Sequence, residues 1–499
     1  MSTIHPHGSE RVTHTVGKKA LIASLRQFLP DSAILAETEQ LRAFECDGLS
    51  AYQCLPWLVV LPDSVEQVQQ LLRVCHRLGV PVVARGAGTG LAGGAIPLDN
   101  GVLLSMARFN RILHIDAANR LARVQPGVRN VAISQAVAQH GLYYAPDPSS
   151  QIACSIGGNV AENSGGVHCL KYGLTTHNIL RLQIVTMDGE RVTIGDHGLD
   201  SPGYDLLALL TGSEGMLGVI VEISVKLLPI PECAQVILAA FNEIELAGNA
   251  VAAIIAEGLI PAGLEMMDKA AIRAAEDFVR AGYPLDAAAI LLCEMDGTEE
   301  QVESDIMKAS QLLQRQGAIE VRVADSEQDR QKMWAGRKAA FPAVGRISAD
   351  YYCMDGTIPR RYLARVLKKI AELSDRYALP VVNVFHAGDG NLHPLILYDA
   401  NNEGEMAKAE RLGGDILRLS VEVGGTITGE HGVGVEKINH MCLQFKEGEL
   451  ALFHAVKLAF DEKGLLNPGK AVPSLHRCAE FGAMHVHRGE LPHPDLERF

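Results

Sequence analysis

The sequence lacks the features of secreted, membrane-spanning and iron–sulfur proteins. Its 10 cysteines include no Cys-X-X-Cys pair and fit no iron–sulfur spacing, so we expect reduced thiols in a cytosolic protein. No apolar run of roughly 18 residues occurs, and we therefore expect no membrane-spanning helix. Residues 1–7 lack the basic start and the apolar stretch that open a signal peptide.

Basic residues are also scarce. The chain has 45 Lys and Arg against 59 Asp and Glu, a net charge of −14, which argues against nucleic acid as a partner. Hydrophobic residues make up 47% and charged residues 21% of the chain, as is typical of a soluble globular enzyme. The 499 residues exceed what one hydrophobic core supports, so we expect about two or three domains.

Secondary-structure signals divide the chain into blocks. A strand at 57–61, a helix at 65–78 that ends at Gly79, and a strand at 80–84 form a βαβ unit. After Pro229-Ile-Pro the pattern changes to strand–helix–strand blocks, which predict an antiparallel sheet of ferredoxin-like type. The predicted division is a helical extension at 1–50, a ligand-binding domain at 51–230, an α+β substrate (cap) domain at 231–425, a C-terminal segment at 426–475 and a tail at 476–499. We expect the tail histidines, His476, His485, His487 and His493, to be solvated.

Three glycine-rich stretches lie in the second block. They are Arg85-Gly-Ala-Gly-Thr-Gly, directly after a predicted strand, Ser155-Ile-Gly-Gly-Asn-Val-Ala-Glu-Asn-Ser-Gly-Gly, and Thr211-Gly-Ser-Glu-Gly-Met-Leu-Gly. Glycine lets backbone amides approach a pyrophosphate closely, and three such loops predict a large dinucleotide lying along a groove. The Gly-X-Gly-X-X-Gly fingerprint with its later acidic residue is absent, which disfavours a Rossmann NAD site.

The most informative motif is His386-Ala-Gly-Asp-Gly-Asn-Leu-His393, followed by Gly429-Glu-His-Gly. Gly-Asp-Gly-Asn is hairpin turn chemistry, so the two flanking imidazoles can lie side by side. Two imidazoles and one carboxylate with an open position suit a catalytic divalent ion, held by His386, His393 and Glu430. Zinc fits this set, and manganese or iron would also be accepted. The neighbouring His431 is then a candidate base; the alternative is a plain turn with polar strand ends.

These motifs, with Asn467-Pro-Gly-Lys, resemble those of the FAD-linked D-2-hydroxy-acid dehydrogenases, whose FAD domain is of the vanillyl-alcohol-oxidase type. The resemblance covers about residues 40 to 480. It implies an α+β fold with a two-part FAD-binding domain and a ferredoxin-like cap domain. It also implies that residues 85–90 hold the FAD pyrophosphate. The implied FAD contacts are Arg85, Gly86, Ala87, Gly88, Thr89, Gly90, Pro146, Gly157, Gly158, Asn163, Gly212, Glu214, Gly218, Ile220 and Asn467.

Departures from the family pattern refine this expectation. Covalently flavinylated members carry a His where this chain has Thr89, so we expect non-covalent FAD. Relatives that act on longer diacids carry a Lys and an Asn at the positions aligned with Cys353 and Leu395, which favours a small monocarboxylate here. We interpret Cys353 itself as a packing residue.

The resemblance implies oxidation of glycolate, and of D-lactate, to the 2-oxo acid. His431 would accept the hydroxyl proton and Arg337 would bind the substrate carboxylate. Electrons would pass to a second flavin-domain-like subunit and an iron–sulfur subunit, which place the chain at the cytoplasmic face of the inner membrane. Four alternatives stay open: a flavoprotein dehydrogenase for another D-2-hydroxy acid, a metallohydrolase, a non-catalytic flavin subunit, and a self-sufficient oxidase that uses O₂.

Overall fold

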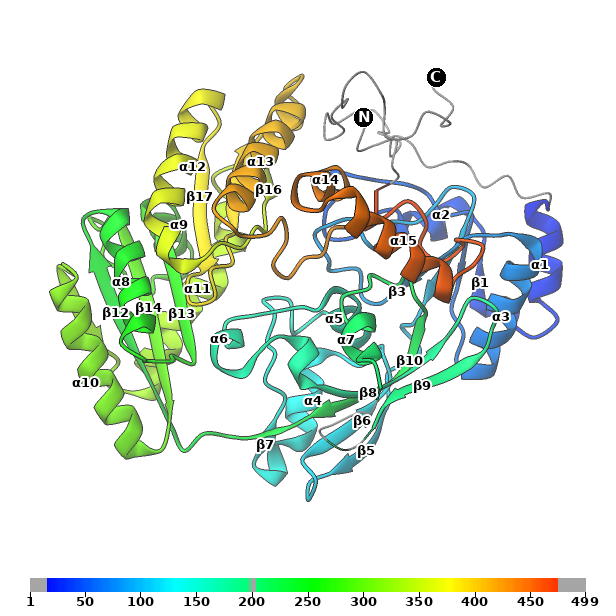
Figure 1. Cartoon of the computed structure of the whole chain (residues 1–499), viewed down its shortest axis with the longest axis horizontal. Helices are drawn as coiled ribbons and strands as arrows, with labels where there is room; N and C mark the ends of the chain where they lie inside the picture. The colour runs from blue at the N-terminus through cyan, green and yellow to red at the C-terminus, as the bar shows by residue number, and fades with distance from the viewer. Residues whose placement is uncertain (1–15, 197, 199–202, 474–499) are drawn as a thin grey trace.

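The computed structural model describes residues 16–196, 198 and 203–473. The chain forms an N-terminal domain up to about residue 230 and a cap domain beside it, and the C-terminal segment then returns to the N-terminal domain (Figure 1). A parallel bridge between Val82 and Leu466 and a hydrogen bond from Lys457 Nζ to the Met216 carbonyl (2.7 Å) secure this return. The predicted tail at 476–499 lies outside the described residues.

The first sheet of the N-terminal domain has the order β1-β2-β4-β3, and β2, β4 and β3 run parallel. Helix α3 connects β2 to β3, which confirms the predicted βαβ unit; it is capped by Ser64 and ends at Gly79 in the left-handed conformation. Strand β3 starts two residues later than predicted, because Pro81 has no N–H to donate. The elements are α1 (Lys18–Leu25), β1 (Ile34–Leu35), α2 (Thr38–Leu41), β2 (Leu58–Val60), α3 (Val65–Leu78), β3 (Val82–Arg85) and β4 (Val102–Ser105).

In the described part of the predicted extension, residues 16–50, a strand accompanies the helices. Strand β1 pairs antiparallel with β2, Ile34 opposite Val60, so this part of the chain belongs to the first sheet. Leu21 and Leu25 of α1 pack in the same buried cluster as Leu71 and Leu72 of α3.

The second sheet of the N-terminal domain is antiparallel, with the order β5-β6-β10-β8-β9. Helices α4, α5 and α7 contribute to its buried cluster through Ile133, Val160 and Leu210. The elements are β5 (Ile112–Asp116), β6 (Leu121–Val124), α4 (Asn130–Val137), β7 (Leu142–Tyr143), α5 (Ile156–Glu162), α6 (Cys169–Tyr172), β8 (Ile179–Val185), β9 (Arg191–Gly195), α7 (Leu206–Leu210), β10 (Val219–Lys226) and β11 (Leu228–Pro229).

The cap domain is built on a seven-stranded sheet in the order β15-β12-β14-β13-β17-β18-β16, and every pairing is antiparallel, as predicted. Side chains alternate along β12: Ile237 and Ala239 join the cluster with α8, α10, α12 and α13, whereas Val236 and Leu238 join the cluster with α9 and α11. Helices therefore cover both faces of the sheet. The strands are β12 (Cys233–Phe241), β13 (Gly263–Asp268), β14 (Ala289–Gly297), β15 (Glu320–Val323), β16 (Asp350–Cys353), β17 (Val381–His386) and β18 (Pro394–Tyr398).

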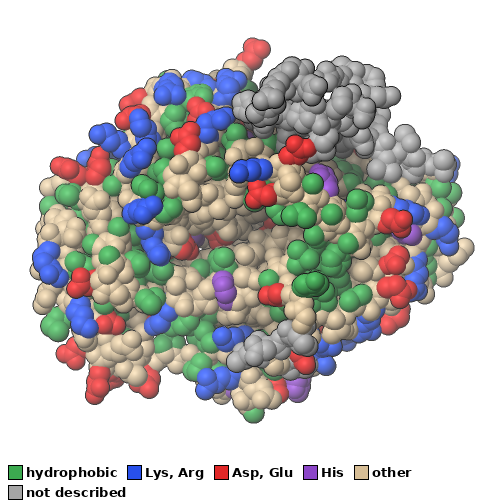
Figure 2. All heavy atoms as spheres, in the orientation of Figure 1, with side chains coloured by type: hydrophobic (Ala, Val, Ile, Leu, Met, Phe, Trp, Pro, Cys, Tyr) green, Lys and Arg blue, Asp and Glu red, His purple; other side chains and the backbone are tan. Residues whose placement is uncertain are grey.

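The remaining helices are α8 (Ile244–Ala256), α9 (Lys269–Val279), α10 (Glu299–Arg315), α11 (Glu327–Val344), α12 (Leu363–Tyr377), α13 (Glu405–Glu422), α14 (Met441–Gln444) and α15 (Glu447–Phe460). Among the described residues, none of the helices combines the length and the apolar character needed to cross a membrane. Among the cysteines that the structure describes, eight carry free thiols and Cys442 is disulfide-bonded, so the expectation of a wholly reduced set is wrong at that residue. In the space-filling view the surface is hollowed between the cap domain and the N-terminal domain (Figure 2).

Candidate active site

A cavity of about 340 Å³ runs from the N-terminal domain toward the cap domain. All six residues of the first glycine-rich loop line it, the second and third loops contribute Gly157, Gly158, Glu214 and Gly218, and strand β10 contributes Ile220. At the other end, His393 of the cap domain and Glu430 and His431 of the C-terminal segment complete the lining. The cavity thus joins the predicted dinucleotide site to the candidate base His431 and to two of the predicted metal ligands, His393 and Glu430.

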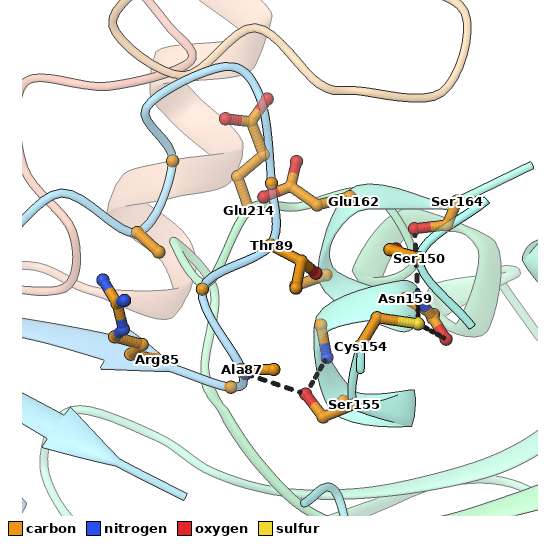
Figure 3. A pocket seen from close by; sticks show the side chains of 18 of the residues that line it. Arg85, Ala87, Thr89, Ser150, Cys154, Ser155, Asn159, Glu162, Ser164 and Glu214 are labelled. Carbon is orange, nitrogen blue, oxygen red and sulfur yellow. Dashed lines mark hydrogen bonds between the residues drawn. The ribbon is translucent and has the colours of Figure 1, made fainter. Parts of the chain in front are cut away.

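Ser155 links the first two glycine-rich loops. Its Oγ atom accepts hydrogen bonds from the Ala87 N–H (3.3 Å) and from the Gly158 N–H (3.4 Å), the second of which caps helix α5. Gly86 passes so close that a Cβ atom there would lie 2.2 Å from Ser155 Oγ. Figure 3 shows the hydrogen bond between Ala87 and Ser155, with Glu162 and Glu214 near the other end of the first glycine-rich loop. The close approach leaves the loop backbone facing the cavity, which fits a pyrophosphate.

Four residues predicted to contact FAD lie outside the cavity lining. These are Pro146, Asn163, Gly212 and Asn467. The side-chain amide of Asn467 donates hydrogen bonds to the carbonyls of Gly94 (3.0 Å) and Glu214 (2.7 Å), and so connects two segments that line the cavity. Asn163 ends α5 in the left-handed conformation, with its side chain bonded to the Thr176 N–H (2.9 Å). Both shape the cavity without facing it.

The hairpin between β17 and β18 explains why two histidine rings meet. Val382 pairs with Leu395, and His386 pairs with Asn391 closer to the turn. His393 follows Asn391 by two residues, and side chains two residues apart share one face of a strand. The ring centroids of His386 and His393 lie 5.2 Å apart, as the hairpin pattern predicted.

The ligand atoms of His386, His393 and Glu430 converge. Glu430 Oε1 lies 3.3 Å from His386 Nε2 and 3.0 Å from His393 Nε2. The Nδ1 atom of His386 faces Glu265 Oε1 (2.8 Å), and that of His393 faces the Met354 carbonyl (3.3 Å). With a proton on each Nδ1, both Nε2 lone pairs point to one place, which is how a divalent ion is held. The residues present therefore fit the ion.

A second group, Cys353, His393 and His431, is also close enough to hold a metal. Burial raises the pKa of the Cys353 thiol well above its ordinary value, which opposes the thiolate that a metal needs. The carboxylate of Glu430 is the better anionic ligand, so the first group fits a divalent ion better than the second.

His431 lies against the cavity with its ring stacked on His393, the two centroids 4.9 Å apart and the planes 10° from parallel. Burial lowers the pKa of His431 to about 4, so the ring is neutral near pH 7 and can accept a proton. Its Nδ1 atom has no hydrogen-bond partner within the part of the chain that the structure describes.

Asp355 holds the loop that carries Glu430 and His431. Its carboxylate accepts backbone hydrogen bonds from Gly429 (3.1 Å), Glu430 (3.2 Å) and His431 (2.9 Å), and a fourth from the Thr428 hydroxyl (2.7 Å). Burial opposes this charge, but His431, which is protonated in the acidic range where the Asp355 carboxyl titrates, and the Lys437 ammonium hold the pKa of Asp355 below its ordinary value.

Arg337 is buried rather than exposed on its helix, at 2% relative accessibility. Its Nη2 atom lies 2.6 Å from Glu265 Oε2, so it reaches the metal-ligand group through Glu265. It does not line the cavity.

Sequence reasoning missed Glu265, Asp355, Ser155 and Glu162. Glu265 could have been noticed because it is an acidic residue within the apolar run Gly-Leu-Glu-Met-Met, now strand β13, and a buried carboxylate needs a partner.

Two family models cover most of the chain. The model described as FAD binding domain matches residues 56–195, and the one described as FAD linked oxidases, C-terminal domain, matches residues 230–471. The chain is 64% identical over 499 residues, 100% of both chains, to "Glycolate oxidase subunit GlcD" of Escherichia coli strain K12. The chain belongs to this family of FAD-linked hydroxy-acid oxidoreductases.

Other family members are less similar to this FAD-linked oxidoreductase. Glycolate oxidase subunit GlcD of Bacillus subtilis strain 168 is 39% identical, over 86% of this chain and 91% of the relative. A D-lactate dehydrogenase of Anaerostipes hadrus is 33% identical, over 90% and 96%.

Solved structures support the vanillyl-alcohol-oxidase-type fold. The 4-ethylphenol oxidase of Gulosibacter chungangensis aligns with a TM-score of 0.79 at 17% identity, covering 94% of this chain and 99% of that one. p-Cresol methylhydroxylase aligns with a TM-score of 0.76 at 18% identity, covering 92% and 97%. At these identities the likeness concerns the fold alone.

Proposed function

We propose that this chain oxidises glycolate, and D-lactate, to the corresponding 2-oxo acid, with a divalent ion at His386, His393 and Glu430. The observation that carries the proposal is the position of His431 and Glu430 at the end of the FAD cavity, beside His393. A relative named glycolate oxidase subunit and another named D-lactate dehydrogenase support the substrate class.

The chain's own residues supply binding and proton transfer. His431 is neutral, has a free ring nitrogen and accepts the proton of the substrate hydroxyl. Arg337 would bind the substrate carboxylate through its Nε atom, which has no hydrogen-bond acceptor among the described residues. Because Arg337 lies outside the cavity lining, this role requires its side chain to turn toward the cavity. Bound FAD supplies a two-electron acceptor for the C2 hydride. A divalent ion at the three ligands supplies Lewis-acid polarisation of the hydroxyl, and zinc suits the ligand set, as do manganese and iron.

The FAD cofactor is non-covalent in this proposal, and its electrons leave through other subunits. The sequence has no cysteine spacing for an iron–sulfur cluster, and two relatives are named as subunits of a glycolate oxidase. We infer that a second flavin-domain-like subunit and an iron–sulfur subunit take the electrons, and that these partners hold the chain at the cytoplasmic face of the inner membrane.

The decisive experiment is anaerobic reduction of the flavin in the isolated chain. Glycolate should bleach the flavin absorption in the absence of any partner, and His386→Ala protein with FAD bound is the matched control that should not bleach. A yellow protein excludes a simple metallohydrolase. If neither glycolate nor D-lactate reduces the flavin, the proposal is wrong and a non-catalytic flavin subunit is favoured.

Reoxidation tests the electron partners separately. Stopped-flow mixing of the glycolate-reduced chain with O₂ should give slow reoxidation, whereas an artificial dye should be reduced rapidly. Rapid reaction with O₂, with peroxide formed at the full turnover rate, would show a self-sufficient oxidase instead.

A further inference from the structure

Glu265 lies directly opposite His386 in the β13–β17 ladder. Directly opposed residues of an antiparallel pair have their Cβ atoms within about 5 Å on one face of the sheet. The pairing therefore brings a carboxylate to the histidine, although the two residues are 121 positions apart, and Glu265 Oε1 lies 2.8 Å from His386 Nδ1. Both side chains are buried, Glu265 at 1% and His386 at 3% relative accessibility.

A buried carboxylate in an apolar strand is unfavourable unless it is paired. Arg337, from helix α11, provides the pair: its Nη2 atom lies 2.6 Å from Glu265 Oε2. The two oxygens of Glu265 thus have different partners, a cation on one side and an imidazole on the other. This arrangement keeps Glu265 as an acceptor only, so the proton on His386 must sit on Nδ1.

Glu265 is not itself a ligand of the same ion. It faces the Nδ1 side of the ring, whereas the Nε2 side faces Glu430, 3.3 Å away. The environment of the other histidine differs, because His393 Nδ1 faces the neutral Met354 carbonyl at 3.3 Å and its nearest carboxylate oxygen, Asp355 Oδ1, is farther away at 3.9 Å. A carboxylate within hydrogen-bond distance of Nδ1 therefore supports His386 and not His393.

We propose that Glu265, held by Arg337, is a positioning residue that fixes the tautomer and ring orientation of His386 and so sets the affinity of the site for its divalent ion. This inference rests on the metal site of the proposed function. A carboxylate behind a metal-bound histidine orients the ring and increases its basicity, and losing it typically lowers metal affinity by about 10–100-fold.

The test measures Zn²⁺ affinity by chelator competition on the FAD-loaded, full-length chain. Glu265→Gln keeps the size of the side chain but removes its charge, and should weaken Zn²⁺ binding about 10–100-fold with the FAD dissociation constant unchanged. Asp268→Asn is the matched control: Asp268 lies on the same strand and bonds the Asn383 N–H (2.7 Å) rather than a histidine. Its Zn²⁺ affinity should equal that of the wild type.

A purely structural role would lower the melting temperature of the metal-free protein and leave the Zn²⁺ affinity unchanged, and that result would overturn the assignment. If Glu265→Gln does not fold, Glu265→Asp, which keeps the charge but withdraws it from the ring, should still weaken Zn²⁺ binding; unchanged affinity there would also overturn it. His386→Ala distinguishes failure of the metal site from failure of the role of Glu265.

If His386→Ala lowers the Zn²⁺ affinity and both Glu265 variants leave it unchanged, only the role of Glu265 is refuted. Wild-type protein that binds no Zn²⁺ refutes the metal site and this inference together.

Discussion

Asp355 and His431 are joined through the backbone rather than through the imidazole: Asp355 Oδ2 accepts the His431 N–H at 2.9 Å, while the ring Nδ1 lies 4.0 Å from the same oxygen. Asp355 therefore fixes the loop and leaves the ring free. Because the same carboxylate accepts the N–H groups of Gly429 and Glu430, one side chain positions a metal ligand and the candidate base together.

Asp355→Asn should destabilise the protein and lower kcat. An amide places a donor against three backbone N–H groups, and breaking a buried charged network of this kind typically costs about 3–5 kcal/mol. Urea denaturation and steady-state kinetics measure the two effects. Asp350→Asn is the control, because Asp350, half-buried at the start of the preceding strand β16, accepts one hydrogen bond from the Ala400 N–H (3.0 Å). Equal effects of the two changes would contradict the role of Asp355.

His431→Asn should lower kcat by roughly 10²–10⁴-fold, the usual range for loss of a general base. Substrate should still perturb the flavin spectrum, since the metal ligands and Arg337 remain. His454→Asn should have no such effect, because His454 bonds the Pro473 carbonyl (3.0 Å) and does not line the cavity. A rate for His431→Asn near that of the wild type would move the proton-accepting role to another group.

Removal of the metal should abolish turnover while FAD stays bound. His386→Ala, His393→Ala and chelation should all have this result, because the two histidines belong to the β17–β18 hairpin of the cap domain, whereas the glycine-rich loops belong to the N-terminal domain. Metal analysis and flavin absorption on the same sample provide the measurement. A fully active, metal-free preparation would disprove the metal's role.

FAD should be released intact when the protein is denatured. Thr89 lines the cavity where covalently flavinylated relatives carry a histidine, and a threonine cannot form the histidyl link. Acid precipitation followed by absorption spectroscopy of the supernatant measures the release. Yellow colour that remains with the washed pellet would contradict the prediction.

Gly432→Ala should impair catalysis more than Gly424→Ala. Both glycines have positive φ, +82° and +85°, so alanine introduces similar backbone strain, about 1–2 kcal/mol, at each. Only at Gly432 would the added Cβ also clash, 2.2 Å from Glu162 Oε2, whereas nothing lies within 4 Å at Gly424. Thermal unfolding and kcat measured together separate strain from displacement of the active-site loop. Equal kcat values in the two variants would show that the loop absorbs the clash.

The sequence alone determined the local helices, strands and turns, and it identified the first glycine-rich loop, whose residues line the cavity. Helix α3 was predictable because a serine cap, a periodic apolar face and a terminal glycine lie within one short segment. The meeting of His386 and His393 was predictable for a similar reason, since a hairpin turn and the two-residue period of a strand fix which side chains share a face. Each of these depends on neighbours in the chain.

Tertiary structure decided which residues from distant segments of the chain contact one another. Glu265 meets His386 only because β13 and β17 are adjacent in the sheet, and Asp355 meets the loop at 429–431 only because β16 and the C-terminal segment pack together. The glycine motifs also could not tell which residues face the cavity, so Asn163 and Asn467 brace its wall instead of lining it. Long-range pairing of buried polar groups follows from the whole packing arrangement, and no local pattern encodes it.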